Sequence, residues 1–147
     1  FYSRTSLSSA INQIDTGVTN NTSYSFSNLA IGKFSSLSFE NGSQTPSGTF
    51  TNTLGLFLGS SISSTSGKLY KNGSSIASST TAQTRTMFNN NIFLGTSNVS
   101  TTNLPVNVFW SSKQYAFSSI GDGLTDTEAT NLYTRVQAFQ TALSRQV

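Results

Sequence analysis

The stretch IGDGLTDTEATNLYTRVQAFQTALSRQV, residues 120–147, predicts how the rest of the chain is arranged. Glycines on both sides of Asp122 indicate a turn, because glycine adopts positive φ without strain. Thr125 then stands at the N-cap position of a helix, and Glu128 follows three residues later, which is the spacing of a capping box. The pattern predicts one helix, from about residue 126 to about residue 144.

Apolar residues recur at helical spacing along this helix and predict one face that packs on another layer. They are Ala129, Leu132, Tyr133, Val136, Phe139 and Leu143. Asp126 and Glu128 place negative charge at the positive end of the helix dipole, and Arg145 places positive charge at the other end. A helix with one apolar face has to cover a surface, so we expect the upstream residues to supply that surface.

The composition of the chain favours exposed β-sheet. Charged residues make up only 9%, against about 25% in an ordinary soluble domain. Serine, threonine and asparagine replace them, while 12% aromatic residues argue against disorder. Hydroxyl-rich segments with aromatic partners suit the exposed faces of sheets. At 147 residues we expect a single domain that spans residues 1–147.

Short runs of strand-forming residues alternate with turn signals, which predicts an antiparallel β-sandwich rather than a parallel sheet. The clearest signal is a hairpin at residues 68–79, because Asn72-Gly73 supplies positive φ at both turn positions. Residues 53–59 form the most apolar run and indicate a central strand. Further strands are expected at residues 1–5, 11–18, 24–26, 34–39, 91–95, 106–110 and 114–120, and polar loops at residues 60–67 and 97–103.

Several classes of function are disfavoured by what the sequence contains. The net charge of +3 comes from scattered cations, whereas nucleic-acid binding needs clustered ones. The chain has no cysteine and no histidine, so disulfides, thiolate sites and the commonest metal ligand are excluded. No apolar run reaches membrane-span length, so we expect no membrane partner. Because the sequence begins at Phe1, we expect a processed product, a cut domain or part of something longer.

Three segments resemble a known family. They are residues 69–80 (LYKNGSSIASST), 91–96 (NIFLGT) and 113–147 (from KQYAFSSIGDGL onward), with a weaker likeness at FYSRT, residues 1–5. They are similar to the concanavalin A-like lectin/glucanase domains, in the laminin-G-like form at the C-terminus of phage and prophage structural proteins. The resemblance implies a jelly-roll fold, a virion or extracellular location, and either glycan attachment or particle architecture. Family members usually carry earlier strands, which this sequence is expected to lack.

The acidic residues do not form a hydrolase pattern. Glycoside hydrolysis needs two carboxylates that flank one bond, and hydrolase relatives of this fold use a Glu-x-Asp-x-x-Glu spacing that is absent here. Asp126 and Glu128 are explained by the helix start and Asp122 by the turn, which leaves Asp15 and Glu40. Asp15 and Asp122 are conceivable calcium ligands. Isolated acids are more often plain surface groups, so we expect no cofactor and no enzyme activity.

Two aromatic residues are the candidates for sugar binding. A sugar site usually combines an aromatic face with amide and hydroxyl partners. Trp110 and Tyr70 both lie near polar loop residues. The competing interpretation, which we favour for the only tryptophan, places Trp110 in the core under the helix. For Tyr70 the competing interpretation is packing across its hairpin.

The leading hypothesis is a non-catalytic binding module of a phage-type virion or tail-fibre protein that attaches to surface glycans. The alternative is a purely architectural subunit of a capsid, tail or extracellular filament. A third class is a glycoside hydrolase. The expected partners are a glycan or cell-surface polysaccharide and other virion subunits, with a homo-oligomer expected.

Overall fold

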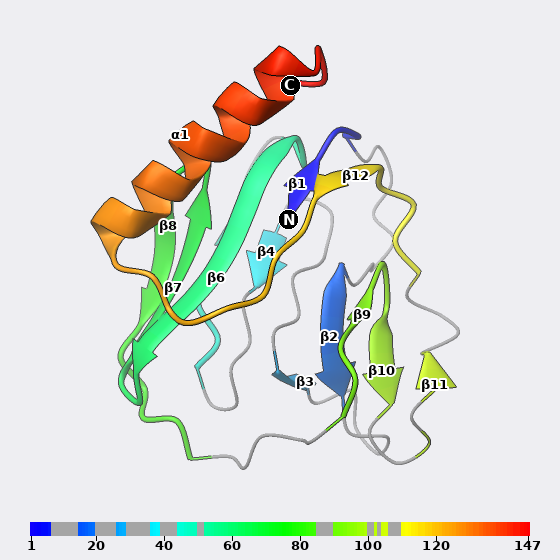
Figure 1. Ribbon diagram of the computed structural model, residues 1–147. Helices are drawn as coiled ribbons and strands as arrows, with labels where there is room; N and C mark the ends of the chain where they lie inside the picture. Colours follow the sequence, from blue (N-terminus) through cyan, green and yellow to red (C-terminus); the bar gives the residue numbers. More distant parts are fainter. Residues whose placement is uncertain are drawn as a thin grey trace.

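A computed structural model describes residues 1–6, 15–19, 26–28, 36–38, 44–49, 52–84, 90–99, 102, 104–105 and 110–147. Within these ranges the chain is mostly β-sheet and ends in one helix, α1 (Asp126–Ala142). This confirms the prediction that the chain is built mainly of β-strands and carries a single helix at its C-terminal end. Figure 1 shows the helix lying across one sheet, with a second group of strands to one side of it.

The start of α1 is closed by the predicted capping box. The hydroxyl of Thr125 accepts a hydrogen bond from the backbone N–H of Glu128 (3.4 Å). The Glu128 carboxylate accepts in return from the backbone N–H of Thr125 (2.9 Å). Asp126 and Glu128 both lie in the first turn, where negative charge meets the positive end of the helix dipole.

The end of α1 departs from the prediction. The helix stops at Ala142, and Ser144 takes a left-handed conformation with φ of 54°. Its N–H donates to the carbonyl of Thr141 (2.9 Å), and the N–H of Arg145 donates to the carbonyl of Gln140 (2.8 Å). This pair of bonds is a Schellman motif. Arg145 therefore lies beyond the last turn, which contains no basic residue, and the predicted charge at that end of the helix is wrong.

The main sheet contains five strands whose neighbours all pair antiparallel. In spatial order they are β12 (Tyr115–Phe117), β1 (Tyr2–Ser3), β6 (Gly55–Ser63), β7 (Ser66–Lys71) and β8 (Ser74–Ser79). The hairpin between β7 and β8 is confirmed, with φ of 50° at Asn72 and 77° at Gly73. Strands β6 and β7 run through most of the predicted loop at residues 60–67, because each satisfies the other's backbone groups.

The remaining strands form a second sheet and a separate pair. The second sheet contains β11 (Leu104–Pro105), β10 (Ser97–Val99), β2 (Thr16–Thr19) and β3 (Phe26–Asn28), with β9 (Phe93–Leu94) also paired to β2. The separate pair is β4 (Ser36–Ser38) with β5 (Ser47–Thr49). Strand β10 lies within the predicted loop at residues 97–103 and pairs parallel with β2. The wholly antiparallel prediction is wrong for this pair, since strands so distant in sequence have no tight turn to set their direction.

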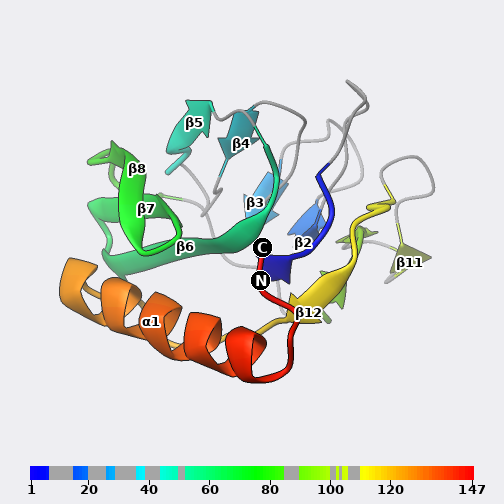
Figure 2. The same ribbon diagram turned by 90° about the horizontal axis from the view of Figure 1, so that it is seen from above.

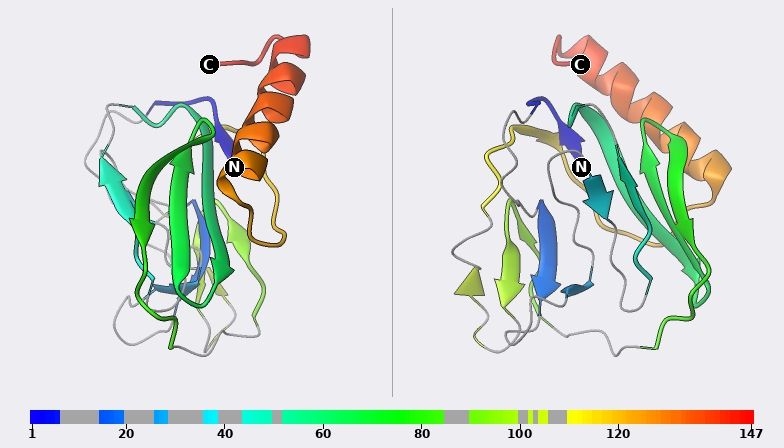
Figure 3. Two further views of the ribbon diagram at one scale, coloured as in Figure 1. Left: turned by 90° about the vertical axis from the view of Figure 1, so that its left-hand side faces the viewer. Right: turned by 180° about the vertical axis from the view of Figure 1, so that it is seen from behind.

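Helix α1 and the second group of strands lie on opposite sides of the main sheet. Figure 2 shows α1 on one side of β6 with β4 and β5 on the other, and Figure 3 shows the main sheet curling. One buried cluster contains Phe1, Phe57 and Leu69, and the cluster under the helix contains Tyr2, Leu56 and Val136. Successive residues of a strand point to opposite faces, which is why Leu56 and Phe57 belong to different clusters.

The buried face of α1 is not the whole predicted apolar face. Its buried residues are Ala129, Val136 and Gln140. Gln140 donates its side-chain amide to a carbonyl of β12 (3.3 Å). Phe139 and Leu143, which were predicted to be in the apolar contact, are 53% and 45% exposed. The prediction is wrong for these two residues because the helix contacts the sheet through neighbouring positions, Val136 and Gln140, instead.

Candidate functional site

Trp110 is an exposed aromatic residue, with 55% of its surface accessible. The expectation that it packs in the core under the helix is therefore wrong. That space is filled by Tyr2, Leu56 and Val136. An exposed indole offers the flat apolar surface that sugar rings stack on.

The backbone next to Trp110 is tied to the second sheet. The N–H of Ser111 donates to the carbonyl of Gly95 (2.7 Å), in the turn between β9 and β10. The hydroxyl of Ser111 donates to Oδ1 of Asp15 (3.0 Å), just before β2. These two contacts fix the position from which the indole of Trp110 projects.

Asp15 is the centre of a buried polar network. Its Oδ2 accepts from the ammonium of Lys113 (2.7 Å), and the Asp15 and Lys113 side chains are both 0% exposed. Its Oδ1 accepts from the hydroxyl of Tyr115 (2.5 Å). Because Tyr115 belongs to β12 and Asp15 leads into β2, the network joins the two five-stranded sheets, and it includes Ser111, the residue after Trp110.

Sequence reasoning did not find this network, although a signal was present. Ser111, Lys113 and Tyr115 are spaced two residues apart, so in an extended segment their side chains point to the same face. A lysine at the centre of such a polar row needs a carboxylate partner when it is buried. The partner, Asp15, is 98 residues away in sequence, and no local pattern connects the two.

The electrostatics of the network follow from its burial. Loss of solvent raises the pKa of the Asp15 carboxyl, while the charge and hydrogen bond of Lys113 act against that rise. Burial, followed by the charge of Asp15, raises the pKa of the Tyr115 phenol well above its usual range. Tyr115 therefore stays protonated at neutral pH and remains a hydrogen-bond donor to Asp15.

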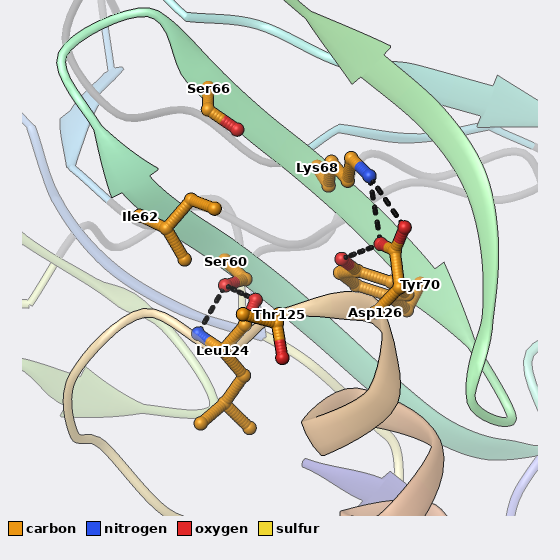
Figure 4. A pocket seen from close by; sticks show the side chains of 8 residues that line it. All are labelled: Ser60, Ile62, Ser66, Lys68, Tyr70, Leu124, Thr125 and Asp126. Atoms are coloured by element: carbon orange, nitrogen blue, oxygen red, sulfur yellow. Dashed lines mark hydrogen bonds and ion pairs between the residues drawn. The ribbon is translucent and has the colours of Figure 1, made fainter.

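Tyr70 does not offer a ring face. It is only 2% exposed, and its hydroxyl donates to Oδ1 of Asp126 (2.6 Å), as Figure 4 shows. The prediction that its ring stacks on a sugar is therefore wrong, because its face is covered. Lys68, two residues earlier on β7, binds both oxygens of Asp126 at 2.8 Å. Burial, together with the bond to Asp126, raises the pKa of Tyr70 well above its usual range.

The same region contains a small cavity of about 140 Å³ between β6, β7 and the start of the helix. On its other side, the hydroxyl of Ser60 accepts from the N–H of Leu124 (2.6 Å) and donates to the carbonyl of Leu124 (2.7 Å). The bonds of Lys68 and Tyr70 to Asp126, and those of Ser60 to Leu124, thus join the helix start to the sheet. We interpret this region as a structural joint.

The carboxylates at the helix start predict whether the free energy of unfolding rises or falls when the pH is lowered. The pKa of Asp126 is lowered by the bond from Lys68 and then that from Tyr70, and the pKa of Glu128 is lowered by the backbone N–H and then the hydroxyl of Thr125. A lowered folded-state pKa stabilises the protein above the unfolded-state value, and this contribution is lost as pH falls through the folded-state value.

We therefore expect the free energy of unfolding to fall between about pH 5 and about pH 3. Urea unfolding of the wild type and of the double variant Asp126→Asn/Glu128→Gln measures this directly. The double variant should be less stable at neutral pH and lose less stability on acidification. Equal acid losses in the two proteins would contradict the assignment. The raised pKa of Asp15 has the opposite sign and adds nothing to the loss.

Three of the four side-chain carboxylates in the described ranges, those of Asp15, Asp126 and Glu128, are bonded to other protein groups. No group of three or more potential metal ligands occurs there. Both oxygens of Asp15, one of the two conceivable calcium ligands, are already bonded to protein groups. Asp126 and Glu128 are engaged at the helix start. Glu40, the remaining hydrolase candidate, lies outside the described residues.

The described residues define a mostly β protein with two five-stranded sheets, a separate two-stranded pair and one C-terminal helix. Comparison with protein-family models, with curated proteins and with solved structures found no significant match. The family suggested by residues 69–80, 91–96 and 113–147 is therefore a hypothesis. In the part of the chain that the structure covers, no helix combines the length and apolar character needed to cross a membrane.

Proposed function

We propose that this protein is a non-catalytic glycan-binding module of a virion or other extracellular assembly, with Trp110 as its sugar-stacking residue. The observation that carries the proposal is the 55% exposure of the only tryptophan. Most large aromatic residues contribute to folding by burial, so an exposed one on a fixed backbone favours binding. A jelly-roll arrangement of the strands is part of the proposal. The pairing of β1 with β12 supports it, because these are the first and last strands of the main sheet in sequence but lie side by side in space.

The fixed backbone matters because a preorganised site loses less conformational entropy on binding. Ser111, the residue after Trp110, is held by its hydrogen bonds to Gly95 and Asp15. The apolar face of a pyranose would lie on the indole. Ser112 and Gln114, both exposed, follow on the same segment and carry hydroxyl and amide groups of the kind that bind sugar hydroxyls.

The test is a glycan array followed by titration with the best ligand. Because Trp110 is the only tryptophan, its intrinsic fluorescence should change on binding without any added label. The variant Trp110→Ala should lose at least about tenfold in affinity. Its free energy of unfolding should change by less than about 0.5 kcal/mol, because the side chain is exposed.

The matched control is Tyr70→Phe, which keeps the buried ring and removes only the hydroxyl bonded to Asp126. It should bind the same glycan with wild-type affinity. Absence of any glycan ligand on the array, or equal affinity of Trp110→Ala and wild type, would reject the proposed site.

The architectural alternative has one observation in its favour. Several large apolar side chains on and beside α1 are exposed, among them Ile120 at 64% and Phe139 at 53%. Exposed apolar surface of this kind is typical of contacts between protein chains. A subunit of a larger particle would bury such residues against its neighbours.

A further inference from the structure

A groove runs between α1 and the segment that leads into it. Figure 1 shows this segment passing from β12 beneath the helix to its first turn. The groove has a volume of about 410 Å³. Its lining includes Ile120, Asp122, Leu124 and Leu132.

The apolar lining continues along the helix. Phe139 lies seven residues after Leu132, and Leu143 lies four residues after Phe139, so the three share one side of α1. Ile120, Phe139 and Leu143 are 64%, 53% and 45% exposed. We call the groove and this row of side chains the helix-groove surface.

The wall of the groove is held in place by β6. Ser60 binds both the N–H and the carbonyl of Leu124 through its hydroxyl. Gly123 lies so close to the carbonyl of Ser61 that an added Cβ would overlap it. The wall is therefore fixed before any partner binds, which lowers the entropy lost on association.

One acid and one base flank the apolar row. Asp122 lines the groove itself. Arg135 lies three residues after Leu132 and four before Phe139, so it borders the same row on the helix. Among the residues that the structure covers, the salt bridges are Lys68–Asp126 and Lys113–Asp15, and neither includes Asp122 or Arg135.

We propose that the helix-groove surface binds a second copy of this chain in a two-fold symmetric dimer. In a two-fold contact the same surface faces itself, so it must carry both members of every complementary pair. The helix-groove surface meets this requirement, since its apolar row is flanked by opposite charges at different positions. Asp122 of each copy would face Arg135 of the other, and the exposed Phe139 ring would enter the groove. The inference does not depend on sugar binding at Trp110, and it would supply a contact that the architectural alternative needs.

The first test is the oligomeric state of the purified protein by sedimentation velocity at concentrations up to about 100 μM. The wild type should be a dimer that dissociates on dilution. The variant Phe139→Ser should be monomeric with an unchanged helical circular dichroism signal, because the ring is exposed within one copy. A monomeric wild type, or a dimeric Phe139→Ser, would overturn the proposal.

The second test is a charge exchange across the contact. The single variants Asp122→Arg and Arg135→Asp each place like charges opposite one another, and each should weaken the dimer at least about tenfold. The double variant Asp122→Arg/Arg135→Asp should recover most of that loss, because the pair is re-formed with reversed sign. Failure of the double variant to recover would reject this pairing. Trp110→Ala should remain a dimer, so loss of sugar binding and loss of the dimer are distinguishable.

Discussion

Lys113→Met should lower the free energy of unfolding by about 3–5 kcal/mol, because it leaves the buried carboxylate of Asp15 without its cation. Methionine matches the length of the lysine stem but supplies no charge or donor. Both charged side chains are 0% exposed, so water cannot replace the lost contact. Urea or thermal unfolding at neutral pH measures the change. Since Ser111 and Tyr115 bind the same carboxylate, the loss should extend to the contact between the two sheets.

The chain contains its own control for this prediction. Lys68 and Asp126 form an ion pair of the same chemistry, but their side chains are 33% and 65% exposed. Lys68→Met should cost less than about 1 kcal/mol, because exposed pairs are screened by solvent. Asp15→Asn/Lys113→Met should recover part of the loss, because asparagine still accepts a hydrogen bond and carries no charge. Equal losses for the two methionine variants would show that burial of the Asp15 pair has no special cost.

Gly55→Ala should destabilise the protein by about 2–6 kcal/mol, because two separate costs add. Gly55 has φ of 101°, which costs a residue with a side chain about 1–3 kcal/mol. An added Cβ would also overlap the Asn72 side chain, whose Oδ1 accepts from the N–H of Leu56 (2.8 Å). Overpacking of this kind costs about 1–3 kcal/mol. Loss of that hydrogen bond would loosen the β7–β8 turn from β6.

Gly121→Ala is the matched control for Gly55→Ala. Nothing lies within 4 Å of a Cβ added at Gly121. Its free energy of unfolding should therefore stay within about 0.5 kcal/mol of wild type. If Gly55→Ala were as stable as Gly121→Ala, the contact between Asn72 and Leu56 could not be the reason for glycine at residue 55.

The features that could be predicted are those whose partners lie close together in the sequence. The capping box needs only Thr125 and Glu128, three residues apart, and it forms as predicted. The turn at Asn72-Gly73 needs two adjacent residues with positive φ, and it also forms. In both cases the interaction closes within one turn, so the local sequence contains all of its participants.

The candidate site could be predicted only in part. Trp110 was a candidate from its residue type, but its exposure depends on which side chains fill the space under α1. The Asp15 network joins residues nearly 100 positions apart, and the parallel pairing of β2 with β10 is equally non-local. The two shortest strands of the main sheet, β1 and β12, contain two and three residues, too few to show an alternating pattern.

By itself the sequence determined the β-rich class, the C-terminal helix with its cap and the hairpin at Asn72-Gly73, because propensity, capping and turn geometry act over a few residues. Only the tertiary structure decided which side chains the helix buries. Gln140 is covered while Phe139 is left exposed. The choice between neighbouring positions on one helix depends on where the opposing sheet lies, and that position is set by contacts between residues far apart in the chain.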